Sequence, residues 1–238
     1  MKPFLIIKTG GTFEDFTPKR GDFEHWTARA MGLPDNQWES IHVQGGAPLP
    51  DPENYAGCVI TGSHDMVTED LDWIHKTTEW IQQAAKTGLP IVGICFGHQL
   101  LAMAFGGKAG FHPNGPEIGT MDISCTEEAD SDPLFSHLPR IFSGHNTHYQ
   151  CALVLPPEAV LLASSAHEPH QAFRYCDNIW GIQFHPEFDA EAERYYIVQQ
   201  TEVIEEHGGS VDVLLSEVTE TPESTKLMVR FVDYCRHR

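Results

Sequence analysis

One short segment of the sequence, residues 89–102 (LPIVGICFGHQLLA), restricts the fold more than any other. Residues 90–95 form an apolar run of the kind that makes a buried strand, and the residues after Gly97 favour a helix. A strand that passes directly into a helix through Gly-x-Cys-x-Gly predicts a nucleophile elbow with Cys95 at its apex. Gly93 and Gly97 fit this geometry because side chains beside such a strained turn would collide. The segment therefore predicts an α/β fold.

The order of elements along the chain agrees with a largely parallel sheet followed by a more antiparallel part. We expect strands at 4–8, 40–43, 57–61 and 90–95 and helices at 21–31 and 71–86; in the second helix Leu71, Ile74, Thr78, Ile81 and Ala85 share one face. Further strands are predicted at 118–125, 141–143, 160–164, 172–175 and 179–184, and a helix at 189–206. After a glycine break, the tail from about 208 to 238 has an acidic stretch at 217–223 and a predicted terminal helix at 225–236. We expect one domain, residues 1–238.

Charge and cysteine usage limit the classes of partner. The formal net charge is −19, which repels phosphate backbones and anionic lipid surfaces, so we expect neither nucleic acid nor membrane as a partner. No apolar run approaches the roughly 20 residues of a membrane span. The six cysteines have no short paired spacing, and the N-terminal apolar run is too short for a signal peptide. The expected location is the cytoplasm.

A second segment, residues 180–188 (WGIQFHPEF), offers the groups that a cysteine nucleophile needs. His185 and Glu187 are two positions apart at the end of a predicted strand, so in extended backbone they project to the same side. Glu187 then orients the imidazole, and His185 exchanges a proton with Cys95 and with a leaving amine. Taken alone, His-Pro-Glu is explained equally well by a surface turn; joined to the elbow it predicts a Cys-His-Glu triad. The amide of Phe96 at the helix N-terminus points to where an oxyanion forms.

These motifs, together with residues 171–174 (QAFR), resemble class I (triad) glutamine amidotransferases, most closely the glutaminase domain of GMP synthases and its stand-alone relatives. The resemblance runs from about residue 40 to about residue 190. It implies a flavodoxin-like three-layer α/β/α fold with a mixed, largely parallel central sheet. It also implies a γ-glutamyl thioester on Cys95 and release of ammonia from glutamine or another γ-glutamyl small molecule. For any ammonia delivered, the partner that it implies is a separate synthetase subunit.

The resemblance also assigns substrate and oxyanion positions. Gln99 matches the residue that hydrogen-bonds the α-amino-acid end of glutamine, although a locally satisfied helix residue is the simpler alternative. Gly62 lies where the family has its oxyanion loop, with Phe96 as the second donor, and an ordinary strand-ending turn stays open there. His148 and Gln150 correspond in spacing to a Ser-His-Gly-Asp stretch whose aspartate meets the substrate amino group. A neutral amide at Gln150 cannot neutralise an ammonium, and we take this to favour a γ-glutamyl compound other than glutamine.

We expect no cofactor and no metal. The histidine-rich pieces at 145–148 and 167–170 have neither the His-Glu-x-x-His pattern nor nearby cysteine pairs. Two further interpretations of the function stay open at this point. One is a γ-glutamyl peptidase or hydrolase with the same triad and no ammonia delivery. The other is a non-catalytic regulatory module, against which the intact elbow and the intact His-Pro-Glu argue.

Overall fold

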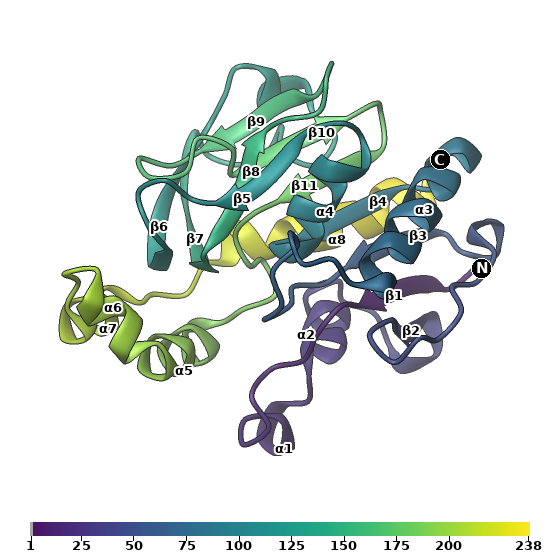
Figure 1. The fold of residues 1–238 in the computed structure, drawn as a ribbon. Coiled ribbons are helices and arrows are strands. Elements are labelled where there is room, and N and C mark those ends of the chain that lie inside the picture. Colours follow the sequence, from purple (N-terminus) through teal and green to yellow (C-terminus); the bar gives the residue numbers. More distant parts are fainter. Residues whose placement is uncertain (1) are drawn as a thin grey trace.

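The central sheet changes character halfway across. The computed structural model describes residues 2–238, and within them nine strands form one sheet in the order β2-β1-β3-β4-β11-β10-β9-β6-β7 (Figure 1). The five strands from β2 to β11 are parallel, and the remaining neighbours are antiparallel. The sheet strands are β1 (Phe4–Lys8), β2 (Trp38–His42), β3 (Gly57–Ile60), β4 (Ile91–Ile94), β6 (Glu117–Cys125), β7 (Ile141–His148), β9 (Val160–Ser164), β10 (Ala172–Tyr175) and β11 (Ile179–Ile182).

Helices cover both faces of the parallel half, and its four inner strands, β1, β3, β4 and β11, are buried almost throughout, whereas the edge strand β2 is largely exposed. The helices are α1 (Thr17–Arg20), α2 (Phe23–Ala30), α3 (Asp72–Thr87), α4 (Phe96–Ala104), α5 (Ala190–Gln199), α6 (Thr201–Glu206), α7 (Val211–Glu217) and α8 (Pro222–Arg236). Val59 and Val92 pack in one core cluster with Phe231 of α8, whereas Ile60 and Ile91 pack in another with residues of α3 and α4. Successive strand residues thus face opposite layers. The expected α/β/α fold with a mixed, largely parallel sheet is confirmed.

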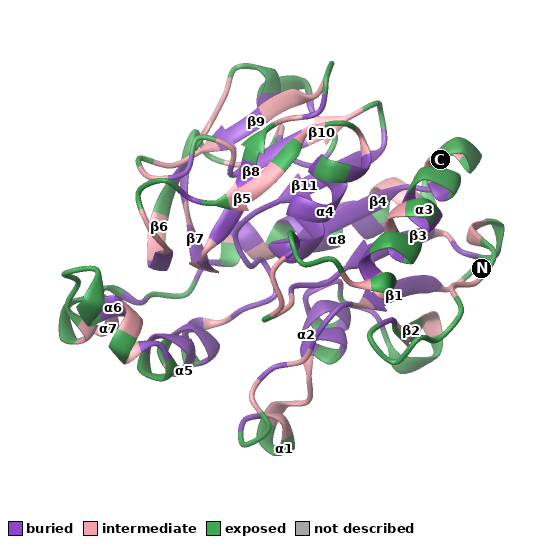
Figure 2. Cartoon of the chain, viewed as in Figure 1, coloured by how far each residue is buried: buried purple, intermediate pink, exposed green. Residues whose placement is uncertain are grey.

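The distribution of buried residues follows these layers. Figure 2 shows them concentrated in the central strands and in α4, while α1 and the α6–α7 region are largely exposed. Of the stripe predicted on α3, Ile74 and Ile81 are buried as expected, but Thr77 and Ala84 are buried in place of Thr78 and Ala85. Trp80 is also buried, and its indole N–H donates to a backbone carbonyl in the loop before β3. Burying this large ring turns the helix relative to the expected stripe.

The helix predicted at 189–206 begins as expected and then breaks. Asp189 is its N-cap, with Oδ1 accepting from the N–H of Ala192 at 2.9 Å. At Gln200 the helix divides into α5 and α6. The Gln200 amide accepts from the Tyr149 hydroxyl at 3.0 Å and donates to Thr147 Oγ1 at 2.6 Å. The break therefore ties the end of α5 to the end of β7, which periodicity along one helix cannot indicate.

Four elements were not predicted: α1, α7, and the strands β5 (Lys108–Phe111) and β8 (Gln150–Val154), which pair antiparallel in a separate ribbon. The ribbon covers the edge of α4. Strand β7 continues beyond the predicted 141–143 to His148, and α8 begins at Pro222, three residues before the predicted start. Within residues 2–238, no helix combines the length and apolar character that crossing a bilayer requires. The cytoplasmic location stays a prediction.

Candidate active site

Cys95 lies at the apex of the strained turn that the sequence predicts. It follows β4, caps α4, and has φ +50° and ψ −100°, a positive-φ conformation that few residues other than glycine adopt. Its N–H donates to the carbonyl of Ile182 in β11 at 2.8 Å. A Cβ on Gly93 would stand 2.4 Å from the carbonyl oxygen of Gly97, and one on Gly97 would stand 2.5 Å from that of Ile60. Both glycines are therefore required by close backbone contacts.

His185 and Glu187 form a buried pair in the loop after β11. Nδ1 of His185 lies 2.8 Å from Oε1 of Glu187, and the imidazole is tilted against the Phe188 ring with centroids 4.2 Å apart. The backbone differs from our expectation, since β11 ends at Ile182 and the pair lies in a turn rather than in extended strand. The turn brings the two side chains together because Pro186 at its centre fixes φ there.

The electrostatics of His185 favour its cationic form. Burial by itself lowers the pKa of an imidazole, but the carboxylate of Glu187 and the sulfur of Cys95 outweigh that effect and raise the pKa of His185 to about 10. At neutral pH this geometry therefore supplies an imidazolium beside the thiol sulfur, the arrangement that stabilises a thiolate. The neighbouring His64 differs, since burial and then the charge of His185 lower its pKa.

A loop after β3 carries Gly62 over the pair. A Cβ on Gly62 would stand 3.2 Å from Cε1 of His185 and 3.8 Å from Cβ of Cys95, so the loop backbone approaches both residues closely. The position of this loop is fixed by Thr9, whose hydroxyl lies 2.9 Å from the carbonyl oxygen of Thr61 and 3.0 Å from that of Gly62. Thr9 also donates its N–H to the Thr61 hydroxyl at 3.1 Å. The loop is thus bonded to the segment that follows β1 and is no free surface turn.

The cavity beside Cys95 has a volume of about 330 Å³. The residues that the sequence assigned to it are brought together: Gln99, His148 and Gln150 all line it. The Gln99 amide donates to the carbonyl of Gln150 at 2.6 Å. The His148 imidazole is held between the same carbonyl at 3.2 Å and Glu117 Oε2 at 3.0 Å. The Gln150 amide donates to Thr68 Oγ1 at 2.7 Å, and its buried Oε1 has no hydrogen-bond partner among the described residues.

A second group of residues in the cavity lining is aromatic. Phe13, Phe23, His64 and Tyr196 belong to it, with His64 Nε2 lying 3.2 Å from the Tyr196 hydroxyl. Phe13 lies in the loop between β1 and α1, and its ring is 4.8 Å from the His64 ring and 5.1 Å from that of Tyr196. We call the bonded group of Gln99, His148 and Gln150 the polar half of the cavity, and this second group its aromatic half.

A second buried polar group lies behind His185. The carbonyl of His145 accepts the N–H of His185 at 2.8 Å, and Nδ1 of His145 lies 4.0 Å from Oε2 of Glu193. Burial raises the pKa of Glu193 to about 8 and lowers that of His145 to about 4, so both are largely neutral at pH 7. Glu193 is a buried carboxyl close to the pair that does not hydrogen-bond to it.

Several residues around the cavity were missed by reasoning from the sequence. Thr9, Phe13 and Tyr196 have no motif of their own, and each reaches the site from a distant element. Gln200 also lines the cavity, at the break between α5 and α6. The one available signal was Gly10-Gly11 beside Thr9, because paired glycines after a strand indicate a tight backbone approach. Gly10 does pack against Ser63, to which an added Cβ would come within 2.6 Å.

Comparisons with known proteins show the family to which the chain belongs. The family model described as glutamine amidotransferase class-I matches residues 34–203. "Gamma-glutamyl peptidase 4" of Arabidopsis thaliana is 33% identical over 194 residues, covering 80% of this chain and 77% of that protein. One subunit of the glutamine-hydrolyzing GMP synthase of Pyrococcus abyssi is 40% identical over 173 residues, covering 70% of this chain and 85% of that one.

A crystal structure of a glutamine amidotransferase from Thermotoga maritima has the same fold, with a TM-score of 0.79, 20% identity and full coverage of both chains. At that identity the likeness concerns the fold alone. The family model matches most of the chain, and the curated relatives are 33% and 40% identical to it. The chain therefore belongs to the class I glutamine amidotransferase family.

Proposed function

We propose that this protein hydrolyses the amide bond of a γ-glutamyl compound through a thioester on Cys95. The observation that carries the proposal is the position of Cys95, at a strained strand-to-helix turn with the His185–Glu187 pair beside it and a cavity in front. Backbone strain in a residue other than glycine persists only where the surroundings enforce it, and such positions cluster at active sites. Membership of a family that includes a gamma-glutamyl peptidase and a glutamine-hydrolyzing synthase supports the same chemistry.

The proposed reaction has two halves. In the first, the Cys95 thiolate attacks the γ-carbonyl carbon, and the amides of Gly62 and Phe96 donate to the oxyanion that forms. The carbon–nitrogen bond then breaks as His185 gives its proton to the leaving nitrogen. In the second half, His185 takes a proton from water, the hydroxide adds to the thioester, and glutamate leaves as the sulfur becomes a thiolate again. Glu187 keeps the imidazole oriented throughout.

The polar half of the cavity is suited to the α-amino-acid end of the substrate. Because the Gln99 amide nitrogen is engaged by the Gln150 carbonyl, the oxygens of Gln99 and Gln150 are the atoms left to accept from a substrate ammonium. Glutamine and γ-glutamyl peptides carry the same α-ammonium group. Contacts to this group alone therefore cannot separate the two substrates, and the inference from Gln150 toward a γ-glutamyl compound other than glutamine stays a prediction. A difference between the substrates arises where the leaving amine lies.

A second candidate, γ-glutamyl peptide hydrolysis, is favoured by the aromatic half of the cavity. Ammonia leaving from glutamine needs no recognition surface, whereas the amino-acid part of a γ-glutamyl peptide needs contact area. Phe13, His64 and Tyr196, which contact one another in the cavity lining, provide such an area. The similarity to gamma-glutamyl peptidase 4 favours the same interpretation.

Delivery of ammonia to a separate synthetase belongs to the first candidate. The relative from Pyrococcus abyssi is named as one subunit of a GMP synthase, which supports a partner protein for a chain of this kind. Under this proposal glutamine hydrolysis responds to the partner. Under the peptidase alternative it does not require one.

The test measures glutamate released by the purified protein from glutamine, glutathione and a γ-glutamyl dipeptide, with Cys95→Ala as the inactive variant and Cys58→Ala as the matched control. Cys58 is buried in β3 and is remote from the cavity lining. Release from glutamine that only Cys95→Ala abolishes supports the glutaminase function. Preference for the two peptides supports the peptidase. Release that persists in Cys95→Ala contradicts both. No release from any of the three is the result expected of a non-catalytic module or of a glutaminase that works only with its partner.

A further inference from the structure

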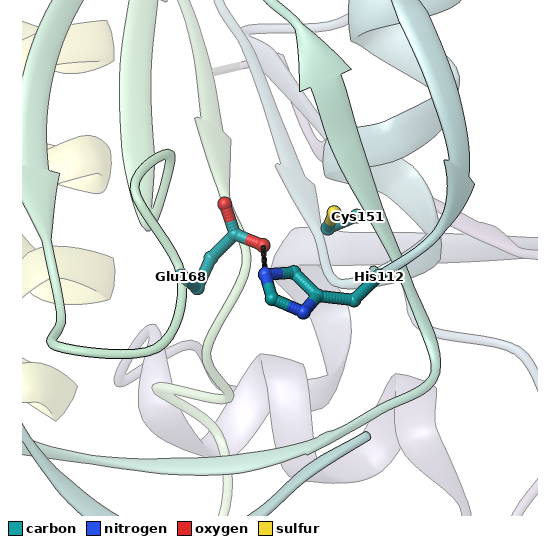
Figure 3. Close-up of side chains that lie close together, drawn as sticks. All are labelled: His112, Cys151 and Glu168. Atoms are coloured by element: carbon teal, nitrogen blue, oxygen red, sulfur yellow. Dashed lines mark ion pairs between the residues drawn. The ribbon is translucent and has the colours of Figure 1, made fainter. Parts of the chain in front are cut away.

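A cluster of three potential metal ligands lies outside the site described above. His112 follows β5, Cys151 lies in β8, and Glu168 lies in the loop between β9 and β10 (Figure 3). All three are buried, and one ligand atom from each lies within 4.8 Å of the other two. Nε2 of His112 lies 3.9 Å from Oε2 of Glu168. Cys151 follows Gln150 in the same strand, so the two side chains point to opposite sides of the ribbon and Cys151 points away from the catalytic cavity.

Glu168 is the residue of this cluster whose surroundings favour a bound cation. Its side chain is completely buried, and Oε1 accepts the N–H of His170 at 2.7 Å, but Oε2 has no hydrogen-bond partner among residues 2–238. In the described chain, the ion-pair partners of Glu168 within 4.0 Å are His112 and His170, with no lysine or arginine. Burying a carboxylate with one oxygen unpaired is costly, and a bound metal ion is one of the few groups that offsets this cost.

We propose that His112, Cys151 and Glu168 form a zinc site. The donor set is imidazole nitrogen, thiolate and carboxylate, each of which is a common ligand of Zn²⁺. A thiolate and a carboxylate together carry two negative charges, so Zn²⁺ makes the buried cluster neutral. The proposal departs from our expectation of no metal, although Glu168 lies in one of the histidine-rich pieces noted in the sequence.

The geometry requires small movements. Ligand atoms around a tetrahedral zinc ion lie roughly 3.3–3.8 Å apart, so atoms now within 4.8 Å of one another have to close by about 1 Å. A water molecule would complete four-coordination. The three ligands come from separate elements, and the ion would fasten the β5–β8 ribbon to the loop that carries Glu168. That loop is already joined to the cavity wall, because Ser165 bonds to Glu117, which in turn bonds to His148.

Two groups must change protonation when the ion binds. Burial and then the neighbouring Glu168 raise the pKa of the Cys151 thiol well above its ordinary range, so zinc has to displace the thiol proton. Nδ1 of His112 accepts the N–H of Asn114 at 3.1 Å, which places the ring proton on Nε2 in the metal-free protein. Coordination through Nε2 moves that proton to Nδ1 and breaks this bond. Asn114 is exposed, so water can replace the lost acceptor. The Asn114 amide therefore reports zinc binding.

The test is carried out in a Cys95→Ala background, because Cys95, His185 and Glu187 are themselves thiolate, imidazole and carboxylate donors. The metal-depleted protein is titrated with Co²⁺ alone, which gives a thiolate-to-metal charge-transfer band when cysteine is a ligand, and then with Zn²⁺ alone in competition. We expect one Co²⁺ per chain with this band, displacement by one Zn²⁺, and a shift of the Asn114 amide signal. Surface histidines, of which the sequence has many, bind Co²⁺ without the band.

The variants decide which residues hold the ion. Cys151→Ala and Glu168→Gln should abolish the band and the stoichiometric binding, whereas Cys58→Ala, at another buried strand cysteine, should keep both. Circular dichroism shows whether each variant folds. If Cys151→Ala does not fold, Glu168→Gln decides, because it keeps the shape of the side chain and removes only the charge. Binding without the band, binding that survives Glu168→Gln, or no binding to the Cys95→Ala protein overturns the proposal. None of these outcomes bears on the reaction at Cys95.

Discussion

Replacing Glu187 with Gln isolates the contribution of one negative charge to the catalytic imidazole, because Gln keeps the shape of the side chain and an oxygen that can accept from the ring. The carboxylate lies 2.8 Å from His185 Nδ1, and its side chain is fully buried, so solvent does not replace it. An opposite charge within about 4–6 Å of a titrating group shifts its pKa by roughly one to three units. Losing the charge of Glu187 should therefore lower the pKa of His185 from about 10 by roughly one to two units.

The sign follows from which form Glu187 stabilises. The imidazolium form predominates below the pKa. The unmodified protein therefore keeps a charged His185 up to about pH 10, and the Glu187→Gln variant should lose that charge at a lower pH. The assay is an NMR titration of the His185 ring signal, assigned by its absence in His185→Gln. Glu193→Gln is the matched control, because that buried carboxyl does not hydrogen-bond to His185 and its replacement should cause a smaller shift. If Glu187→Gln leaves the titration midpoint unchanged, Glu187 does not raise the pKa of His185.

Three further predictions concern the walls of the site. Gly62→Ala should lower turnover by up to about 100-fold, because the added methyl group presses on the His185 ring and even a small displacement of a catalytic group slows the reaction. Steady-state rates measure this, and an unchanged rate argues against the close approach of Gly62 to His185. Thr9→Val should destabilise the protein by roughly 1–3 kcal/mol, since the buried carbonyls of Thr61 and Gly62 lose the hydroxyl donor that they share. Urea unfolding measures the change, and an unchanged midpoint would count against the bonds to the Gly62 loop. Gln150→Asp should lower KM about tenfold or more for both glutamine and glutathione, and by the same factor, because both carry the α-ammonium group. A change in KM for only one of the two contradicts the placement of the α-ammonium beside Gln150.

The parallel half of the fold could be predicted because its signals are local. Apolar runs bounded by glycine or proline marked β1, β3 and β4 within one residue of their bounds, and Gly93 and Gly97 predicted the turn at Cys95. A strand buried on both faces needs an uninterrupted apolar run, and a strained turn needs glycine at fixed positions. Both requirements concern residues that are adjacent in the sequence, so they can be recognised without the fold.

The elements that were missed depend on contacts between distant segments. The β5 segment (Lys108–Phe111) is short and half exposed, and it becomes a strand because β8 pairs with it. The break at Gln200 comes from bonds to Tyr149 and Thr147, about fifty residues away in the chain. The same holds for the aromatic half of the cavity. Its residues have no common spacing, so only the folded chain brings them together.

The most direct test of the account is the reactivity of Cys95 at neutral pH. Iodoacetamide alkylates thiolates, and peptide mapping gives a separate rate for each of the six cysteines. Burial raises the pKa of Cys58, Cys125, Cys151 and Cys235, which leaves the exposed Cys176 as the competitor. Cys95, although only 5% exposed, should react faster than Cys176 because a cationic His185 lies beside its sulfur. A Cys95 that reacts no faster than Cys176 would contradict the claim that it is the nucleophile.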